Sequence, residues 1–192
     1  MNRTKRKIFE ISMKLFAEKG YDATSIEEIT ATVGVAKGTL YYHFSSKEEI
    51  FEFLVDEGIK LLKNSISIKT EKLTNSIDKI RAIILIQIKV LFKYENFITI
   101  ILSQIWGSDT KNQLCRKYLF EYIQMIEEIV QEGINKGEII KRDANVIASG
   151  IFGFICSSFI YKMRHDGKIN VQQLFAEVDS IFIKKLANNF GR

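Results

Sequence analysis

Residues 20–51 read GYDATSIEEITATVGVAKGTLYYHFSSKEEIF and carry the signals of two short helices in succession. Ser25, followed three residues later by Glu28, has the pattern of a capping box, which predicts a short helix that ends at Gly34. A second short helix is predicted over residues 36–43. Two short helices joined by a tight turn that contains glycine form a helix-turn-helix.

The rest of the chain also has helical patterns. Apolar residues between Lys5 and Lys19 recur with the spacing of an amphipathic helix, and Ser46 with Glu49 forms a second capping box that starts a helix running to Ser65 or beyond. Further helices are expected at 75–93, 96–107, 109–136, 143–166 and 170–189. We therefore predict an all-α protein with about nine helices.

Composition supports helices over strands. The isoleucine-rich runs at 80–92 and 97–102 suit strands by residue preference, but they are long and are flanked by helix signals. The chain has no proline, although average usage would give about ten, so no residue forces a helix to break.

Length and charge narrow the class of protein. At roughly 150 residues per domain, 192 residues make one domain or two small ones. Hydrophobic residues make up 46% and charged residues 27%, as in soluble globular proteins. The net charge is +5, of which residues 1–47 carry +3, so the N-terminal quarter holds most of the excess and suits an anionic partner.

The cysteines and the N-terminus point to a cytoplasmic protein. Cys115 and Cys156 lie in apolar sequence with no CxxC spacing, so buried thiols are expected, with neither a disulfide nor a metal. The basic start is not followed by a signal-peptide core. The longest uncharged stretch, residues 146–161, is shorter than the ~20 residues of a membrane span, so we expect a buried helix and no membrane partner.

Residues 4–55 resemble the DNA-binding signature of the TetR family of bacterial transcriptional regulators. The resemblance is carried by LFAEKGY at 15–21, the Thr24–Ser25 pair, Ile29, the Gly34–Val35 turn, KGTLYYHF at 37–44, and Lys47. It implies a DNA-binding domain over residues 1–47 and a helical domain for effector binding and dimerisation over 48–192. One departure is Ala36, which stands where a serine or threonine commonly caps the recognition helix.

The second helix of a helix-turn-helix lies in the major groove, where its leading side chains reach base edges and its neighbours hold phosphates. We expect DNA contacts from three places: the recognition helix at 36–43, the two residues at the start of the preceding helix, and the start of the helix that follows Ser46. The full set is Thr24, Ser25, Lys37, Gly38, Thr39, Tyr41, Tyr42, His43 and Lys47. Three alternatives stay open: Tyr41 could pack inside the protein, His43 could cap its helix, and the other polar side chains could simply be solvated.

The C-terminal part is rich in aromatic residues, which could line a pocket for a lipophilic or aromatic effector. The candidates are Phe92, Phe97, Trp106, Tyr118, Tyr122, Phe152 and Phe159. The alternative is that these side chains only fill the core.

Residues 148–158, ASGIFGFICSS, mix small and large apolar residues, so this helix can approach another closely. Together with the last helix it resembles the two-helix face through which the family dimerises. The interface candidates are Ile151, Phe154, Ile155, Leu174, Val178, Ile181 and Phe182, with packing inside one chain as the alternative. A two-fold dimer would read two half-sites of DNA.

The function expected from the resemblance is that of a homodimeric repressor, bound to a near-palindromic operator and released by a small molecule. The rival hypotheses are a helical enzyme or carrier for a hydrophobic molecule and a DNA binder without a preferred site. The chain has no P-loop, HExxH or CxxC motif, and its two histidines, His43 and His165, are far apart. We therefore expect no catalytic residue, no metal and no cofactor.

Overall fold

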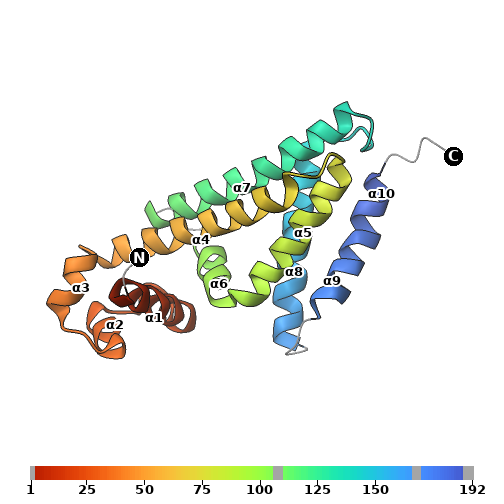
Figure 1. Cartoon of the computed structure of the whole chain (residues 1–192). Coiled ribbons are helices and arrows are strands. Elements are labelled where there is room, and N and C mark those ends of the chain that lie inside the picture. The colour runs from red at the N-terminus through yellow and green to blue at the C-terminus, as the bar shows by residue number, and fades with distance from the viewer. Residues whose placement is uncertain (1–2, 106–109, 166–169, 188–192) are drawn as a thin grey trace. The chain divides into compact units, whose positions relative to one another are not determined.

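The computed structural model describes residues 3–105, 110–165 and 170–187 (Figure 1). Apart from one isolated bridge between Ile139 and Ala187, these residues form helices and their connections, which confirms the all-α prediction. The helices are α1 (Arg3–Lys19), α2 (Ile26–Val33), α3 (Lys37–His43), α4 (Lys47–Thr70), α5 (Ser76–Lys93), α6 (Glu95–Ser103), α7 (Thr110–Asn135), α8 (Ala144–His165), α9 (Val171–Val178), the π-helical turn η1 (Asp179–Ile183) and α10 (Lys184–Leu186).

The predicted helix starts are confirmed by their hydrogen bonds. Ser25 Oγ accepts from the Glu28 N–H at 3.1 Å and starts α2, and Gly34 ends it with φ 78°, in the left-handed region that favours glycine. Ser46 Oγ likewise accepts from the Glu49 N–H at 3.1 Å and starts α4. Ala36 is the N-cap residue of α3 and makes no side-chain cap hydrogen bond.

The chain forms two compact units. The first contains Met1–Lys60 and Tyr94–Tyr118, and we call it the helix-turn-helix unit; the second contains Leu61–Lys93 and Leu119–Arg192. In the helix-turn-helix unit, α6 packs along α1, and one apolar core joins residues of α1 to α4 with Ile100, Ile101 and Cys115. The three motif helices are therefore completed by α6 and by the start of α7.

The second unit is built around α5, which packs against α8 and α9. The strand-suited run at 80–92 is helical, and its isoleucines at 80, 83, 84 and 88 are fully buried. The last helix differs from the regular one expected, because η1 inserts a π-helical turn between α9 and α10. Asp179, the first residue of that turn, accepts from Arg81 Nε on α5 at 2.7 Å.

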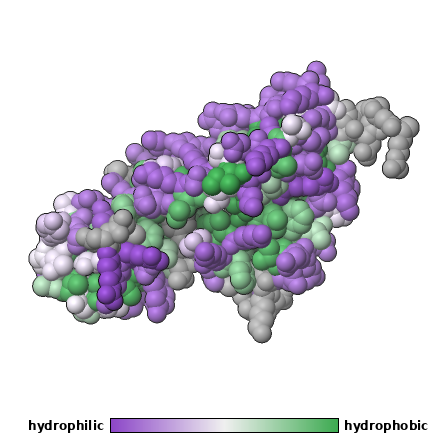
Figure 2. Space-filling view, in the orientation of Figure 1, coloured by the Kyte–Doolittle hydropathy of each residue, from purple (hydrophilic) through white to green (hydrophobic). Residues whose placement is uncertain are grey.

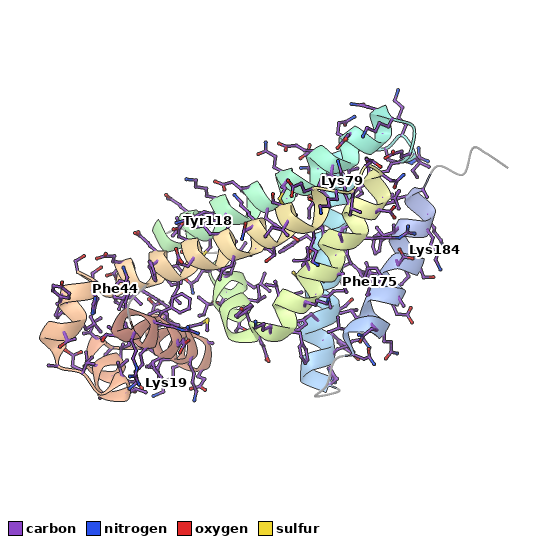
Figure 3. The ribbon with its side chains drawn as sticks, viewed as in Figure 1. Lys19, Phe44, Lys79, Tyr118, Phe175 and Lys184 are labelled. Carbon is purple, nitrogen blue, oxygen red and sulfur yellow. The ribbon has the colours of Figure 1, made fainter. Side chains whose placement is uncertain are left out.

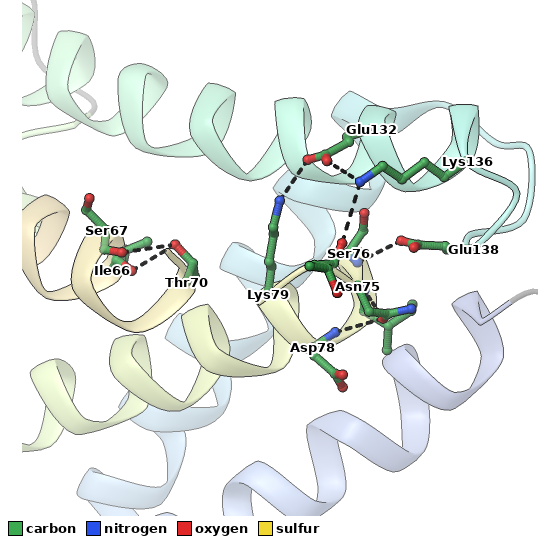
Figure 4. A network of polar contacts seen from close by, with 12 residues as sticks. Ile66, Ser67, Thr70, Asn75, Ser76, Asp78, Lys79, Glu132, Lys136 and Glu138 are labelled. Carbon is green, nitrogen blue, oxygen red and sulfur yellow. Dashed lines mark hydrogen bonds and ion pairs between the residues drawn. The ribbon is translucent and has the colours of Figure 1, made fainter. Parts of the chain in front are cut away.

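A polar network fixes the corner where α5 begins and α7 ends (Figure 4). Asn75 Oδ1 caps α5 by accepting from the backbone N–H groups of Ile77 and Asp78. Glu138 accepts from the Ser76 N–H at 2.7 Å, and Glu132 pairs with Lys79 at 3.0 Å. The bonds from Asn75 and Glu138 satisfy backbone donors that the first turn of α5 cannot satisfy itself, and the Lys79–Glu132 ion pair ties α5 to α7.

Helix α8 is only partly buried, so the expectation of a buried helix is wrong for one of its faces. Ala144–Lys162 is long and apolar enough to cross a membrane by length and composition, with a mean hydropathy of 1.6. Core helices of soluble proteins meet the same criterion, so this is weak evidence for a span. Only 33% of that window is buried, and Figure 2 shows apolar surface where Figure 1 draws α5 and α8.

Gly133 generates the first prediction, because α7 approaches the start of α5 closely at this residue. A Cβ atom at position 133 would lie 2.8 Å from Ser76 Cβ and 2.5 Å from Ile139 Cδ1. Gly133→Ala should therefore lower the free energy of unfolding by about 1–3 kcal/mol, measured by urea denaturation. The control is Gly38→Ala, whose new Cβ meets no atom within 4 Å. Equal stability of the two variants would contradict the close approach.

Candidate nucleic-acid interface

Helix α3 has one buried side and one open side. Leu40 is fully buried, and Phe44, labelled in Figure 3, closes the helix inside the same core. On the open side, Tyr42 is 84% exposed and Tyr41 45% exposed. A seven-residue helix is too short to be stable by itself, so these two apolar anchors hold it and decide which side chains face outward.

The leading end of α3 carries an ion pair. Lys37 Nζ lies 2.5 Å from Glu27 Oε1 on α2, and both side chains are more than half exposed. The hydrogen bond from Lys37 lowers the pKa of the Glu27 carboxyl, and the same bond raises the pKa of Lys37. Glu27 therefore offsets the positive charge of Lys37 at the leading end of α3.

The backbone of α3 is open to close approach by another molecule at Gly38, which has no side chain. Gly38 is exposed, and a Cβ at this position would meet open space. Thr39 and His43 are half-buried, and the His43 ring lies edge-on to Tyr42 with centroids 5.0 Å apart. The open side of α3 thus has no side chain at Gly38, and the hydroxyl-bearing rings of Tyr41 and Tyr42 follow one turn later.

Thr24 and Ser25 have structural partners in this chain. Thr24 is 1% exposed, and its hydroxyl donates to the Gly20 carbonyl at 2.8 Å, which closes the end of α1. Ser25 is exposed, and its hydroxyl caps α2. The Thr24 side chain therefore has no surface to offer to DNA.

Lys47 also has partners inside the chain. Its ammonium donates to the carbonyls of Thr24 at 2.8 Å and of Tyr21 at 3.0 Å. The sequence pattern could not separate this role from a phosphate contact, because a lysine in the first turn of a helix is compatible with both.

Lys7 is a residue that the sequence reasoning missed. Its ammonium donates to the Val33 carbonyl at 2.6 Å and so ties α1 to the last turn of α2. The sequence offers only its position in a basic segment, which does not distinguish a free charge from a bonded one. At least one basic residue of the N-terminal quarter, Lys7, therefore serves to hold α1 and α2 together.

Two of the predicted effector residues meet in the core of the second unit. The Tyr122 ring lies edge-on to Phe152 with centroids 5.9 Å apart, and the Tyr122 hydroxyl donates to Gln87 Oε1 at 3.0 Å. Gln87 Nε2 lies 3.7 Å from Cys156 Sγ. Burial raises the pKa of Tyr122 far above its usual value and that of Cys156 to about 12, so this polar chain is neutral. Gln87 is the single amide in an isoleucine-rich run, and the sequence patterns did not identify it as a candidate effector residue.

The other predicted effector residues are spread over the molecule. Phe159 is buried in the second unit, and Phe92 is half exposed. Tyr118 belongs to the helix-turn-helix unit, where its hydroxyl donates to Asp56 Oδ1 at 2.9 Å. The Phe97 side chain and Trp106 lie outside what the structure describes.

The residues predicted for dimerisation divide into two groups. Four of them fill the interior of one chain, where they are almost fully buried: Ile151, Ile155, Leu174 and Val178. Phe154 and Phe182 are half-buried and pack edge-on with centroids 4.9 Å apart, and Ile181 is 46% exposed. The first group has no surface for a second copy, so its apolar character comes from packing within the chain.

The geometry defines a helix-turn-helix protein with a separate helical unit, and comparison with known proteins gives the family. Residues 8–54 match the model for bacterial regulatory proteins of the tetR family, and residues 55–185 match the model for the C-terminal region of YsiA-like proteins. The chain belongs to the TetR family, whose members are transcriptional regulators, as the resemblance implied.

Individual relatives agree with this assignment. The uncharacterized HTH-type transcriptional regulator YerO of Bacillus subtilis (strain 168) is 27% identical over 97% of this chain, which spans 64% of that protein. The biofilm operon icaADBC HTH-type negative transcriptional regulator IcaR of Staphylococcus aureus (strain Newman) is 42% identical over 38% of this chain and 40% of that protein. This chain thus spans less than two thirds of either relative.

Solved structures share the fold over nearly the whole chain. A proposed fatty acid metabolism regulator from Clostridium perfringens is 32% identical, with a TM-score of 0.88, and the match covers 94% of this chain and 98% of that one. The regulator FadR from Bacillus subtilis, solved in complex with stearoyl-CoA, is 23% identical, with a TM-score of 0.83 over 94% of this chain and 98% of that one.

The ion pair at the start of α3 leads to the second prediction. Glu27→Gln should raise the affinity for duplex DNA by roughly two- to threefold, because it frees Lys37 and removes an exposed carboxylate beside it. The measurement is fluorescence anisotropy with a labelled duplex. Glu28→Gln is the matched control, since it makes the same charge change on the same helix but affects a carboxylate that pairs with Lys19. An equal gain in both variants would show that only net charge matters.

Proposed function

We propose that this protein is a ligand-responsive transcriptional repressor that acts in the cytoplasm and binds a near-palindromic operator as a homodimer. The observation that carries the proposal is the open side of α3, where Lys37, Gly38 and Tyr42 face solvent while Leu40 anchors the helix in the core. Such a helix can enter the major groove with its leading residues toward the bases. The DNA contacts that we propose are those of α3: Lys37, Gly38, Thr39, Tyr41, Tyr42 and His43.

The sign of regulation is supported by IcaR, which is named as a negative regulator and is 42% identical over 74 residues. A helix-turn-helix bound at a promoter excludes the transcription machinery without needing a further contact, so repression is also the simplest outcome. An enzyme or carrier without specific DNA binding would leave the exposed phenols and the glycine of α3 without a role.

We propose a fatty acyl thioester as the effector. The C. perfringens protein, 32% identical over nearly all of this chain, is described as a regulator of fatty acid metabolism. The core of the second unit suits an acyl chain, because it is apolar and its polar chain through Gln87 and Tyr122 is neutral. An amide and a phenol can bind the carbonyl of a thioester, and the surrounding isoleucines can bind the hydrocarbon.

We propose that a second copy of the chain covers the open face of α8. This stripe consists of Val146, Gly150, Gly153, Ser157, Ile160 and Tyr161, whose spacing of three and four residues places them on one side of the helix. A Cβ atom at either glycine would meet open space, so another helix can approach the backbone there. Val146, Ile160, Tyr161 and Ile181 on η1 are large apolar side chains exposed in the single chain.

The third prediction concerns this interface. Ile160→Glu should convert the dimer to a monomer in sedimentation velocity, because it places a charge in the apolar stripe, where burial without a partner is costly. Phe120→Glu is the control: Phe120 on α7 is also an exposed apolar residue, but it lies outside the stripe, so this variant should stay dimeric. Dissociation of both variants, or of neither, would contradict the assigned face.

The fourth prediction tests the function. Selection of bound fragments from a random DNA pool should recover an inverted repeat with two half-sites, because a two-fold dimer presents two copies of α3. Stearoyl-CoA should then release the recovered duplex, whereas free coenzyme A should not, because it lacks the acyl chain. Recovery of no preferred sequence, or release by neither compound, would count against a ligand-responsive repressor.

One variant separates the effector site from DNA binding in the same assay. Tyr122→Phe removes the hydroxyl that bonds Gln87 and leaves the ring in place. It should keep the affinity for the duplex and raise the stearoyl-CoA concentration needed for release by roughly fivefold, the factor associated with one hydrogen bond. An unchanged release curve would place the effector elsewhere in the protein.

A further inference from the structure

The last helix buries its apolar residues at an unusual spacing. Helices α9, η1 and α10 follow one another without a break. Leu174, Val178 and Ile183 are buried almost completely, so the steps between them are four residues and then five. A regular α-helix returns to the same side after three or four residues, and the longer step lies where the helix is π-helical. The backbone shows the extra residue directly, because the Lys184 N–H donates to the carbonyl of Asp179, five residues before it.

This extra residue changes which side chains enter the core of the second unit. In a regular α-helix the positions three, four and seven residues after Val178 would face inward, and they hold Ile181, Phe182 and Lys185. In the structure Ile183 is inside instead, whereas Lys185 is exposed and Ile181 is 46% exposed. Burying a lysine without a partner is costly. The π-helical turn therefore places an isoleucine in the core where a regular helix would place a lysine, and it leaves Ile181 outside.

Both ends of the π-helical turn are fixed to other parts of the second unit. At its start, Asp179 accepts from Arg81 Nε on α5 at 2.7 Å, and the Asp179 side chain is only 15% exposed. Beyond its end, the Ile140 N–H donates to the Leu186 carbonyl at 2.9 Å. Because the helix is held before and after η1, it cannot absorb the extra residue by sliding along α5. The wide turn is therefore a fixed feature of the fold.

The residues that η1 turns outward continue the open face of α8. Phe182 packs edge-on against Phe154 of α8, with ring centroids 4.9 Å apart. Phe154 lies four residues after Gly150 and three before Ser157, so it is on the same side of α8 as the exposed stripe. Ile181 directly precedes Phe182 and extends this side onto the last helix. Apolar surface thus continues from the stripe of α8, through an aromatic pair, to η1.

We propose that η1 fits this chain to a second copy of itself: its extra residue turns Ile181 and Phe182 out of the core and onto the face that the second copy covers. The inference rests on the dimer of the proposed function and deepens it, because it assigns the register of the last helix within that interface. The occupant is a second copy because TetR regulators act as dimers and because the face continues the stripe of α8. In a two-fold dimer each change in this face occurs twice.

Deletion of Ser180, our fifth prediction, separates the interface from the core. Ser180 is exposed, so its loss removes no core packing. Without it, Ile183 lies four residues after Val178, and an ordinary α-helix keeps it inside. Ile181 then lies only two residues after Val178, on the side opposite the core and away from α8. The dissociation constant of the dimer should rise roughly tenfold, which corresponds to about 1.4 kcal/mol, measured by sedimentation over a dilution series.

Two controls accompany the deletion. Ser180→Ala changes the same residue and keeps the length of the chain, so it should dimerise like the wild type. Folding is compared with that of Ile160→Glu at a concentration where both variants are monomeric. The two should then have the same midpoint of urea unfolding, because both keep the core and lose the partner. A deletion variant that is as stable as this monomer and dimerises like the wild type would overturn the inference.

A pair of point variants tests the same face without changing the length of the helix. Ile181→Ser should raise the dissociation constant roughly tenfold, because it removes an apolar side chain from both halves of the interface. Ile68→Ser is the matched control: Ile68 on α4 is 62% exposed and lies outside the face, so this variant should dimerise like the wild type. Equal effects of the two changes, or no effect of Ile181→Ser, would overturn the inference even where the deletion variant does not fold.

The same measurements separate failure of the inference from failure of the proposed function. If the wild type is monomeric at every concentration, the proposed dimer is wrong and the inference fails with it. If Ile160→Glu dissociates the dimer while the deletion of Ser180 and Ile181→Ser do not, the proposed dimer is supported and only the role of η1 is wrong.

Discussion

The burial of Leu40 and Phe44 decides which residues α3 exposes, and the proposed DNA-facing surface depends on it. Helix α3 has seven residues and no side-chain cap, so its own backbone hydrogen bonds cannot keep it folded. Burying one leucine side chain contributes roughly 1.5–3 kcal/mol, which is enough to select the helical state of so short a segment once the surrounding core is formed. The two anchors also determine which residues face outward, because side chains on the opposite side of the helix cannot turn inward. Stability and recognition are therefore set by the same contact.

The lysines of the helix-turn-helix unit show why net charge is a poor guide to DNA contacts. Lys7 and Lys47 donate to backbone carbonyls, and Lys37 pairs with a carboxylate. These charges are largely committed in the free chain, so the surface of α3 is less cationic than the count over residues 1–47 indicates. In the DNA interface proposed above, contacts from the phenols of Tyr41 and Tyr42 and close approach at Gly38 then carry more of the binding. Such a surface would gain affinity from shape fit and hydrogen bonds more than from the salt-dependent attraction between free ammonium groups and phosphates.

Local signals made the helices predictable, whereas their partners were not. Ser25, Gly34 and Ser46 specify starts and stops through bonds within a few residues, so the sequence alone locates them. Periodicity shows that α8 has apolar residues on several faces, but it cannot show which face another helix of the same chain covers. The structure shows that Ile151 and Ile155 are buried within the chain, and that the face of α8 with Gly150 and Gly153 is the exposed face. The role of Lys47 was hidden for the same reason, since its acceptors lie more than twenty residues away in the sequence.

The shared core of the helix-turn-helix unit constrains how a signal can reach α3. Ile100 and Ile101 of α6 and Cys115 of α7 pack in the same core as Leu40, and α4 holds the α1–α2 connection through Lys47. A close-packed core does not deform continuously, so a shift of α4, α6 or α7 must either leave that core intact or replace its packing with another discrete arrangement. Moving the three motif helices together with the parts of α4, α6 and α7 that share their core breaks no contact inside that core, whereas unfolding α3 would expose both of its anchors. Release from DNA by reorientation is therefore less costly than release by unfolding α3. An effector can shift the protein toward the reoriented state by as much free energy as the difference between its affinities for the two states.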